Sequence, residues 1–337
     1  MTPPGIREEQ LAEPAPAAPG PASRRGRRRP GRPGRPGRPA RSAGGVSEAN
    51  ARAAWLFLSP ALVMIGIFFF LPIVAAFLLS FSDFDIYAIA DARNVRVVGF
   101  GNYARLLATS DFWHALKVTL YFALLGGPLS VATSLAAALL VNAKALRLRG
   151  LFRTVYFAPF VTTLVAVAIV WRYLYHPQYG LIDFALRRLG LPAIDWLGDP
   201  RWAMPAIIAM AVWKNFGYNM LVFIAGLQTI PDELYEAAEL DGAGPWRRFW
   251  SVTFPMLGPT LLFVGVITMI GYLQLFAEPY VMTQGGPVRA TTSVVLYMYE
   301  EGFRWWRMGF AASIAFVLFV VILLATAVQF RLGQEKA

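Results

Sequence analysis

Six long runs of the chain carry almost no charge and predict membrane-spanning helices. No charged residue occurs in 53–82, 118–143, 154–171, 249–277 or 308–330, and 202–231 holds only Lys214. A membrane helix needs about 20 mostly apolar residues. The pattern therefore predicts six spans, at about 55–80, 118–142, 152–173, 203–227, 257–281 and 308–330. The fifth run is longer than one span and contains Pro255 and Pro259, so we expect its helix to begin near Leu257.

The composition agrees with an all-α polytopic membrane protein. Of the 337 residues 57% are hydrophobic and 15% are charged, whereas a soluble domain has about 45–50% apolar and about 25% charged residues. The chain has no Cys and only two His, which argues against disulfides, a cysteine nucleophile and a metal site. A P-loop and the common hydrolase motifs are also absent from the sequence. We therefore expect no catalytic residues, no metal and no cofactor.

The first 50 residues form a basic tail that differs from the rest. Residues 1–54 hold 11 Arg against 4 acidic residues and so carry +7 of the net charge of +11. Pro, Gly, Ala and Arg dominate residues 1–50, and such a composition predicts disorder. The tail would lie near anionic lipid headgroups; an arm for the DNA minor groove is the alternative. We favour the lipid because a membrane span follows, and assign residues 51–335 to one transmembrane domain.

The distribution of basic residues predicts the orientation. Six spans place both termini on one side, and Lys and Arg favour the cytoplasmic side. With the termini inside, the inner segments 144–153, 232–248 and 331–337 hold 8 Lys and Arg in 34 residues. The outer segments 82–112, 172–201 and 278–307 hold 10 in 91 residues. We therefore expect a multi-pass membrane protein with both termini in the cytoplasm.

The loop after the fourth span carries the most informative pattern. Pro231 suits the first position of a helix, and Asp232 and Glu233 suit the first turn beside the positive end of the helix dipole. Gly242 suits the position just past a helix end. A helix over 231–241 follows, and because it is too short to be stable alone it must dock on another surface.

The same loop resembles a known family. Its residues Glu236-Ala237-Ala238, Gly242, Val252 and Phe254-Pro255 have the spacing of the EAA loop, with Val252 and Phe254 replacing the usual Ile and Leu. That loop marks the membrane subunits of binding-protein-dependent ABC importers. Two outer segments, Gly99–Thr119 and Met282–Ala311, are similar to the carbohydrate type, in particular to the subunit related to the larger maltose-transporter permease. The resemblance covers about residues 50–330.

The resemblance implies a fold, a mechanism, partners and a location, the plasma membrane of a bacterium or archaeon. The fold would be that of a type I ABC importer permease, with six spans and a short cytoplasmic coupling helix. A second permease would complete the pathway, two ATP-binding subunits would hydrolyse ATP, and an extracytoplasmic solute-binding protein would deliver the cargo. The residues that couple the chain to the ATPase would be Glu236, Ala237, Ala238, Asp241 and Gly242. Glu236 would contact the ATPase, the two alanines would allow close approach, and Gly242 would allow a sharp turn.

Polar residues inside two spans are candidates for the substrate pathway, because buried polar groups in membranes are costly and face the bundle interior. In the fourth span Asn215, Tyr218 and Asn219 share a face, beside Lys214. In the fifth span the candidates are Thr268, Gln274 and Glu278, which share an arc with Gly271, and the bordering Tyr272. Tyr218 also matches, by its offset from the EAA loop, a substrate-lining position of the maltose permease. The alternatives are hydrogen bonds between helices, and pairing of Lys214 with Glu278.

Several functions are compatible with these features. The leading hypothesis is the permease subunit of an ATP-driven sugar importer. A polyol or glycerol phosphate is the alternative cargo, since Lys214 would suit a phosphate. An intramembrane enzyme would need a carboxylate cluster or metal site at a membrane face, but the acidic residues gather in the short helix instead. A membrane-tethered nucleic-acid binder would act through the tail; we expect no nucleic-acid partner.

Overall fold

The computed structural model describes residues 48–143 and 146–334, and these are mainly helical. The predicted tail, residues 1–50, lies almost wholly outside the described residues. Four described helices are long and apolar enough to cross a membrane: Ala54–Leu79, Ser110–Asn142, Pro200–Gln228 and Met308–Gly333. Two bent helix pairs bring the number to six if each pair counts as one span. The described chain is therefore compatible with six spans, and within it a lone β-bridge joins Ser82 and Val97.

The chain divides into Met1–Pro60 and Ala61–Ala337. In the first unit the described residues form the start of α1, Glu48–Ile65. The second unit begins with the end of that helix and continues through a π-helical turn, Gly66–Phe70, into α2, Leu71–Leu79. None of the residues in the most apolar part of Ala54–Leu79 is buried. Such a surface needs lipid or another protein against it.

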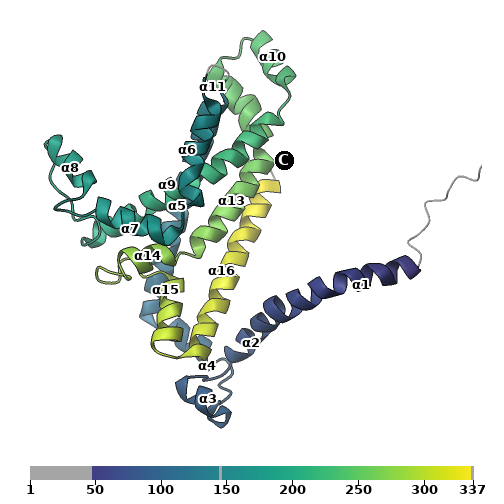
Figure 1. The fold of residues 1–337 in the computed structure, drawn as a ribbon, viewed down its shortest axis with the longest axis vertical. Coiled ribbons are helices and arrows are strands. Elements are labelled where there is room, and N and C mark those ends of the chain that lie inside the picture. Colours follow the sequence, from purple (N-terminus) through teal and green to yellow (C-terminus); the bar gives the residue numbers. More distant parts are fainter. Residues whose placement is uncertain (1–47, 144–145, 335–337) are drawn as a thin grey trace, which may run out of the picture. The chain divides into compact units, whose positions relative to one another are not determined.

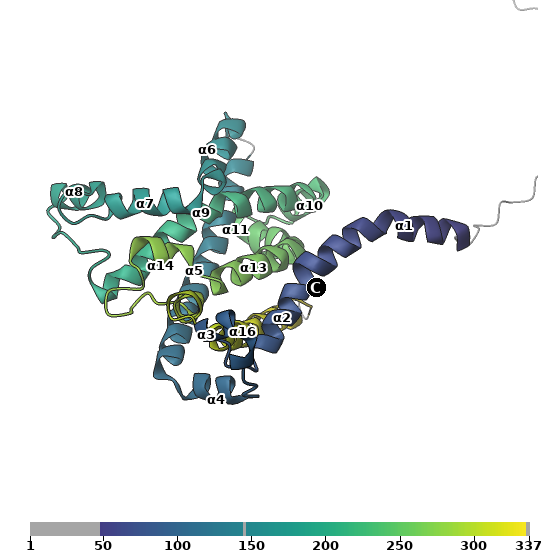
Figure 2. The ribbon, with the colours of Figure 1, turned by 60° about the horizontal axis from the view of Figure 1, so that its bottom comes forward.

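Four helices form the centre of the second unit: α5 (Ser110–Asn142), α9 (Pro200–Gln228), α13 (Gly258–Leu273) and α16 (Met308–Gln334). In Figures 1 and 2, α9 and α13 lie against α5, and α16 lies along α13. The main apolar cluster joins α5, α9 and α13 through buried side chains that include Phe122, Ile207 and Leu273. Small residues such as Ala206 and Ala211 let the backbones approach, which is the usual basis of helix packing in membranes.

The third predicted span, 152–173, is broken in the structure. It consists of α6 (Arg149–Val161) and α7 (Leu164–Leu174), which are bent by 98° relative to each other. Thr162 and Thr163 lie in extended conformations between them. Pro159 lacks the N–H that would continue the hydrogen-bond ladder, which explains why the helix ends nearby. The expectation of one continuous helix here is corrected accordingly.

The loop after α9 forms the short helix α10, Asp232–Leu240, with Pro231 before it and Asp241 after it. The next segment starts at Pro245 and comprises α11 (Pro245–Arg248), η3 (Phe249–Thr253) and α12 (Phe254–Met256). It is bent by 69° from α13, which begins at Gly258. The bounds of α10 lie within one residue of the start and end expected for the short helix, 231–241.

The fifth predicted span, 257–281, is longer than the helix that the structure forms. The helix α13 ends at Leu273, and a separate helix α14 covers Ala277–Met282. Pro279 explains the break, because a proline near a new helix start leaves no interior hydrogen bond unmade. The expectation that residues 268–278 continue as one helix is therefore wrong.

The remaining helices are short: α3 (Ile86–Ala90), η2 (Ala92–Asn94), α4 (Gly101–Ala108), α8 (Leu181–Arg188), α15 (Val294–Tyr299) and η4 (Glu300–Arg304). The α4 helix is fixed by the buried Asn102, whose amide donates to the carbonyls of Ser80 and Ser82 at 2.9 and 2.8 Å. Arg289 joins α5 to η4 by ion pairs with Asp111 at 2.6 Å and Glu300 at 3.6 Å.

The ring of Tyr297 lies beside the ion pairs of Arg289, whose guanidinium is 5.9 Å from the ring centre. Burial, followed by the charges of Glu301 and Asp111, raises the pKa of Tyr297 to about 12. The phenol therefore stays neutral and contributes a ring face rather than a charge to the cluster.

Close approach of α6 and α9 yields a stability prediction. A Cβ at Gly217 would overlap the carbonyl of Tyr156, whereas Gly258 at the start of α13 has open space around it. We expect Gly217→Ala to destabilise the protein by about 1–3 kcal/mol, the usual cost of overpacking, and to lower the unfolding temperature in detergent. The control Gly258→Ala should leave that temperature unchanged or raise it, because alanine favours a helix. Equal unfolding temperatures for the two variants would contradict the close approach.

Candidate functional site

A cavity of about 450 Å³ opens inside the helix bundle, and most of the predicted pathway residues line it. Its lining residues come from α5, α6, α9, α13 and α14: Phe122, Phe160, Asn215, Tyr218, Asn219, Ile267, Thr268, Gly271, Tyr272 and Glu278. The two polar faces inferred from helical spacing thus meet in one place. A cavity of this size accommodates a small polar solute.

The polar wall of the cavity is held by hydrogen bonds between and within helices. Asn219 on α9 donates its amide to the hydroxyl of Thr268 on α13, at 3.0 Å. Asn215 donates to the carbonyl of Ala211 one turn earlier on α9, at 2.9 Å. Each amide keeps its oxygen as a further acceptor. The wall therefore combines the predicted helix–helix hydrogen bonding with groups that a solute can use.

Aromatic pairs form two further parts of the lining. The rings of Phe160 and Tyr218 stack at 4.7 Å, and those of Phe122 and Tyr272 stack at 4.9 Å. Gly126 makes room for the second pair, because a Cβ there would lie 2.7 Å from the Tyr272 ring. The Tyr272 hydroxyl is buried and has no hydrogen-bond partner of good geometry among the described residues. Such a group usually awaits a water or a ligand.

The cavity lining contains an acidic residue, and the nearby lysine lies outside it. Glu278 on α14 lines it, whereas Lys214 does not. The Lys214 ammonium instead donates to the Phe160 carbonyl at 3.3 Å and lies 5.4 Å from the Phe160 ring centre. Among the described residues Lys214 and Glu278 form no ion pair within 4 Å, so the alternative of a direct pair is not seen, but the charges of the two groups still interact at longer range. The lining thus contains one carboxylate and no cation.

Gln274 departs from the prediction. The proposed arc required α13 to continue to Glu278, but the helix ends at Leu273 and Gln274 follows it, exposed and outside the cavity lining. Glu278 reaches the cavity from α14 instead. Sequence reasoning also missed Phe122, Phe160 and Ile267, because apolar residues in an apolar run give no signal of which side they face.

The short helix α10 presents its predicted coupling residues away from the bundle. On its inner side the Tyr235 hydroxyl contacts that of Thr253 at 3.1 Å, and Arg248 binds Glu239 at 3.1 Å. Glu236 and Ala237 are exposed and Ala238 is half-buried. An exposed carboxylate beside small side chains suits close approach of a second protein.

The end of α10 is a Schellman motif. The N–H of Ala243 donates to the carbonyl of Ala238 at 2.9 Å, and that of Gly242 to Glu239 at 3.0 Å. Gly242 has φ +74°, and a Cβ there would meet no atom within 4 Å. The conformation rather than crowding therefore requires glycine, as the predicted turn implied. Asp241, the last predicted coupling residue, occupies the cap position just before it.

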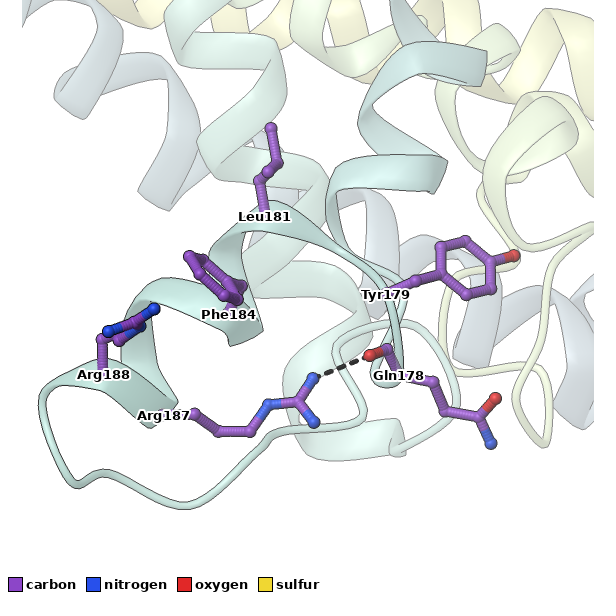
Figure 3. A pocket seen from close by; sticks show the side chains of 6 residues that line it. All are labelled: Gln178, Tyr179, Leu181, Phe184, Arg187 and Arg188. Atoms are coloured by element: carbon purple, nitrogen blue, oxygen red, sulfur yellow. Dashed lines mark hydrogen bonds between the residues drawn. The ribbon is translucent and has the colours of Figure 1, made fainter.

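A second hollow, of about 470 Å³, lies beside α8 and was not predicted. Figure 3 shows the lining side chains, with Arg187 reaching back to the carbonyl of Gln178. In the part of the chain that the structure describes, no group of three or more His, Asp or Glu is placed to hold a metal ion.

The contact between Asn219 and Thr268 generates a prediction for the cavity wall. Thr268→Val keeps the shape but removes the acceptor, so the Asn219 amide loses its partner. We expect a loss of about 0.6 kcal/mol, the average measured for hydrogen bonds between membrane helices, and at most about 1.7 kcal/mol. A double-mutant cycle with Asn219→Ala, read by unfolding in detergent, measures the coupling. Thr268→Ser keeps the hydroxyl and serves as control; additive losses in the cycle would show that the bond contributes nothing.

Curated relatives align with almost the whole described chain. The lactose transport system permease protein LacF of Rhizobium radiobacter is 36% identical over 84% of this chain and 94% of its own length. The trehalose/maltose permease protein MalF of Thermococcus litoralis is 34% identical over 85% and 95%. The sn-glycerol-3-phosphate permease protein UgpA of Agrobacterium fabrum is 33% identical over 85% and 96%.

A solved structure and a family match agree with these relatives. A bacterial ABC transporter for import of the acidic polysaccharide alginate superposes with a TM-score of 0.71 at 23% identity, over 86% of this chain and 98% of that chain. The fold is thus the predicted one, that of a type I ABC importer permease. Residues 130–336 match the family described as the inner membrane component of binding-protein-dependent transport systems. This chain therefore belongs to the family of inner membrane permease components of binding-protein-dependent ABC transport systems.

Proposed function

We propose that this permease imports a neutral sugar or a similar polyhydroxylated solute through the cavity between α5, α9 and α13. The observation that carries the proposal is the lining itself: two stacked aromatic pairs, two amides and a buried tyrosine hydroxyl that makes no hydrogen bond of good geometry with a described residue. Sugars offer hydroxyls to planar polar groups and C–H faces to aromatic rings, so this lining suits them. The lactose and the trehalose/maltose permeases among the relatives support the same class.

Each side chain has a part in this proposal. Asn215 and Asn219 offer amide oxygens, and the Tyr272 hydroxyl offers a donor. The ring of Tyr218, backed by Phe160, offers a flat apolar surface. Thr268 holds the Asn219 amide in place. Gln274 is not proposed as a contact, because it lies outside the lining.

Glycerol phosphate is the second candidate cargo, supported by the relative UgpA and by the nearby ammonium of Lys214. The charges of the lining favour the neutral sugar. Glu278 would repel a phosphate, whereas the Lys214 ammonium is engaged with Phe160 rather than with the cavity. Lys214 would have to change its side-chain conformation to reach a phosphate there.

The coupling part of the proposal rests on α10. We place Glu236, Ala237 and Ala238 in a groove of an ATP-binding subunit, with Asp241 and Gly242 shaping the turn that follows. Two such subunits would hydrolyse ATP, and this chain would take no part in that chemistry. A second permease would complete the pathway and cover exposed apolar surface. A solute-binding protein would deliver the sugar on the opposite side, and both termini would be cytoplasmic.

The cargo proposal predicts the effect of three variants. Tyr218→Ala removes the flat ring and should raise the KM for sugar uptake by about tenfold, equivalent to about 1.4 kcal/mol. Tyr121→Ala removes an exposed ring on α5 and is the matched control, with no change in KM expected.

Glu278→Gln removes the negative charge of the lining and should improve uptake of glycerol 3-phosphate relative to neutral disaccharides. The assay is uptake of labelled solutes by vesicles that contain the assembled transporter; an unchanged KM in Tyr218→Ala would contradict the sugar site.

The coupling proposal predicts loss of transport without loss of insertion. Gly242→Arg and Glu236→Lys should reduce uptake to background and abolish its coupling to ATP hydrolysis, while the chain still reaches the membrane. Gly242→Ala and Gly244→Ala form a matched pair, because both glycines have open space and only Gly242 has a positive φ. We expect the first to reduce coupling through backbone strain of about 1 kcal/mol, and the second to leave it intact. Normal uptake in Gly242→Arg would overturn the role of α10.

A further inference from the structure

Residues 176–191, which we term the α8 arm, form a braced projection between α7 and α9. The Asp183 carboxylate is fully buried and accepts from the Ile194 N–H at 3.0 Å and the Trp196 indole at 3.3 Å. The Arg187 guanidinium donates to the carbonyls of Pro177 and Gln178 at 3.1 and 2.9 Å. These bonds tie α8 to both flanking loops, so its outer face is presented in a fixed orientation.

That outer face is apolar and largely exposed, with the Tyr179 ring stacked on that of His176 at 3.5 Å. Leu181 and Phe184, one turn apart on α8, are 66% and 54% exposed, and Tyr179 just before them is 63% exposed. Together with Arg188, whose guanidinium lies 5.3 Å from the Phe184 ring centre, they border the hollow in Figure 3. A fixed helix that exposes a continuous apolar face needs an apolar environment.

The aromatic residues around the arm indicate its depth. Tyr175, the buried residue just before the arm, packs against Trp196 at 5.6 Å, and Trp196 packs against the exposed Trp202 at 5.4 Å. Trp202 lies at the start of α9, and α10 follows the other end of α9. Trp and Tyr concentrate at the level of the lipid headgroups. The arm thus leaves the bundle at the membrane interface on the side opposite α10, and Figure 1 shows α8 at the edge of the bundle beyond α7.

The charges of the arm are of one sign. Its charged residues are Asp183, Arg187 and Arg188, and because Asp183 is fully buried the exposed charges are both positive. Exposed apolar side chains of α7, such as Val170 and Tyr173, precede it along the chain. An apolar face that continues from a membrane helix and is flanked by arginines is the pattern of a helix lying in an anionic lipid surface.

We propose that the α8 arm is an interfacial anchor that binds anionic phospholipid in the leaflet opposite the coupling helix. Leu181, Phe184 and Tyr179 lie among the upper acyl chains, and Arg188 binds the headgroup phosphate. The proposal does not depend on the cargo. The arm would thereby fix the end of α7, the second half of the third span, at the membrane surface.

The absence of Cys from the chain permits a direct test. Phe184→Cys carries a nitroxide label in the full-length chain, which is then assembled with its partner subunits in phosphatidylcholine vesicles, with or without an equal part of phosphatidylglycerol. The control is Val97→Cys, an 85% exposed position before α4. We expect the label at 184 to collide with oxygen and to be shielded from a water-soluble nickel complex, and the label at 97 to show the reverse.

Lipid selectivity is read from a bimane label at position 184 and quenching by brominated lipids. We expect brominated phosphatidylglycerol to quench about fivefold more effectively than brominated phosphatidylcholine, the factor that corresponds to about 1 kcal/mol for one basic residue. Arg188→Gln should abolish that preference while the label stays in lipid; Arg187 is left unchanged because it braces the arm. Equal quenching by the two lipids in the unaltered arm would overturn the headgroup assignment. A label that is water-exposed until the solute-binding protein is added would overturn the anchor and make the arm a docking surface for that protein.

Discussion

Polar groups inside the membrane bundle have to be satisfied by the protein, because lipid offers them no partner. The structure meets this demand with a small number of contacts between helices. Asn219 donates to Thr268, Tyr175 donates to the Ala206 carbonyl, and Lys214 donates to the Phe160 carbonyl. These contacts fix which faces of α6, α7, α9 and α13 meet, and hence where the cavity lies. The Tyr272 hydroxyl, which makes no hydrogen bond of good geometry with a described residue, lies in that cavity.

Close approach of the helices depends on small residues at the crossings. Gly217 lets α9 meet the backbone of α6, and Gly126 lets the Tyr272 ring lie against α5. A glycine is also required in the loop of α10, where Gly242 has a positive φ. Packing and turn geometry thus use glycine for different reasons. This difference explains why a methyl group at Gly217 should affect stability and one at Gly242 should affect coupling.

Two surfaces of the second unit are braced from within and apolar or charged on the outside. The loop of α10 is held by Tyr235 and Arg248 and exposes Glu236 and Ala237. The α8 arm is held by Asp183 and Arg187 and exposes Leu181 and Phe184. In both surfaces, the hydrogen bonds that hold the segment in place are made by residues other than these exposed ones. Both surfaces are therefore accessible, and we propose a protein partner for the first and a lipid for the second.

The sequence alone determined the features that depend on neighbouring residues. Uncharged runs predicted the helices, Pro231 and Gly242 predicted the ends of the short helix, and the EAA spacing indicated the family. Helical periodicity also placed Asn215, Tyr218 and Asn219 on one face. Only the tertiary structure decided which apolar side chains join them, because Phe122 and Tyr272 are distant in sequence and an apolar run does not mark its inward side. The tertiary structure also decided that α13 ends at Leu273. This break leaves Gln274 outside the cavity lining, and Glu278 reaches the cavity from the separate helix α14. The sequence did not show the break because a helix end in an uncharged run depends on packing and on a proline several residues ahead.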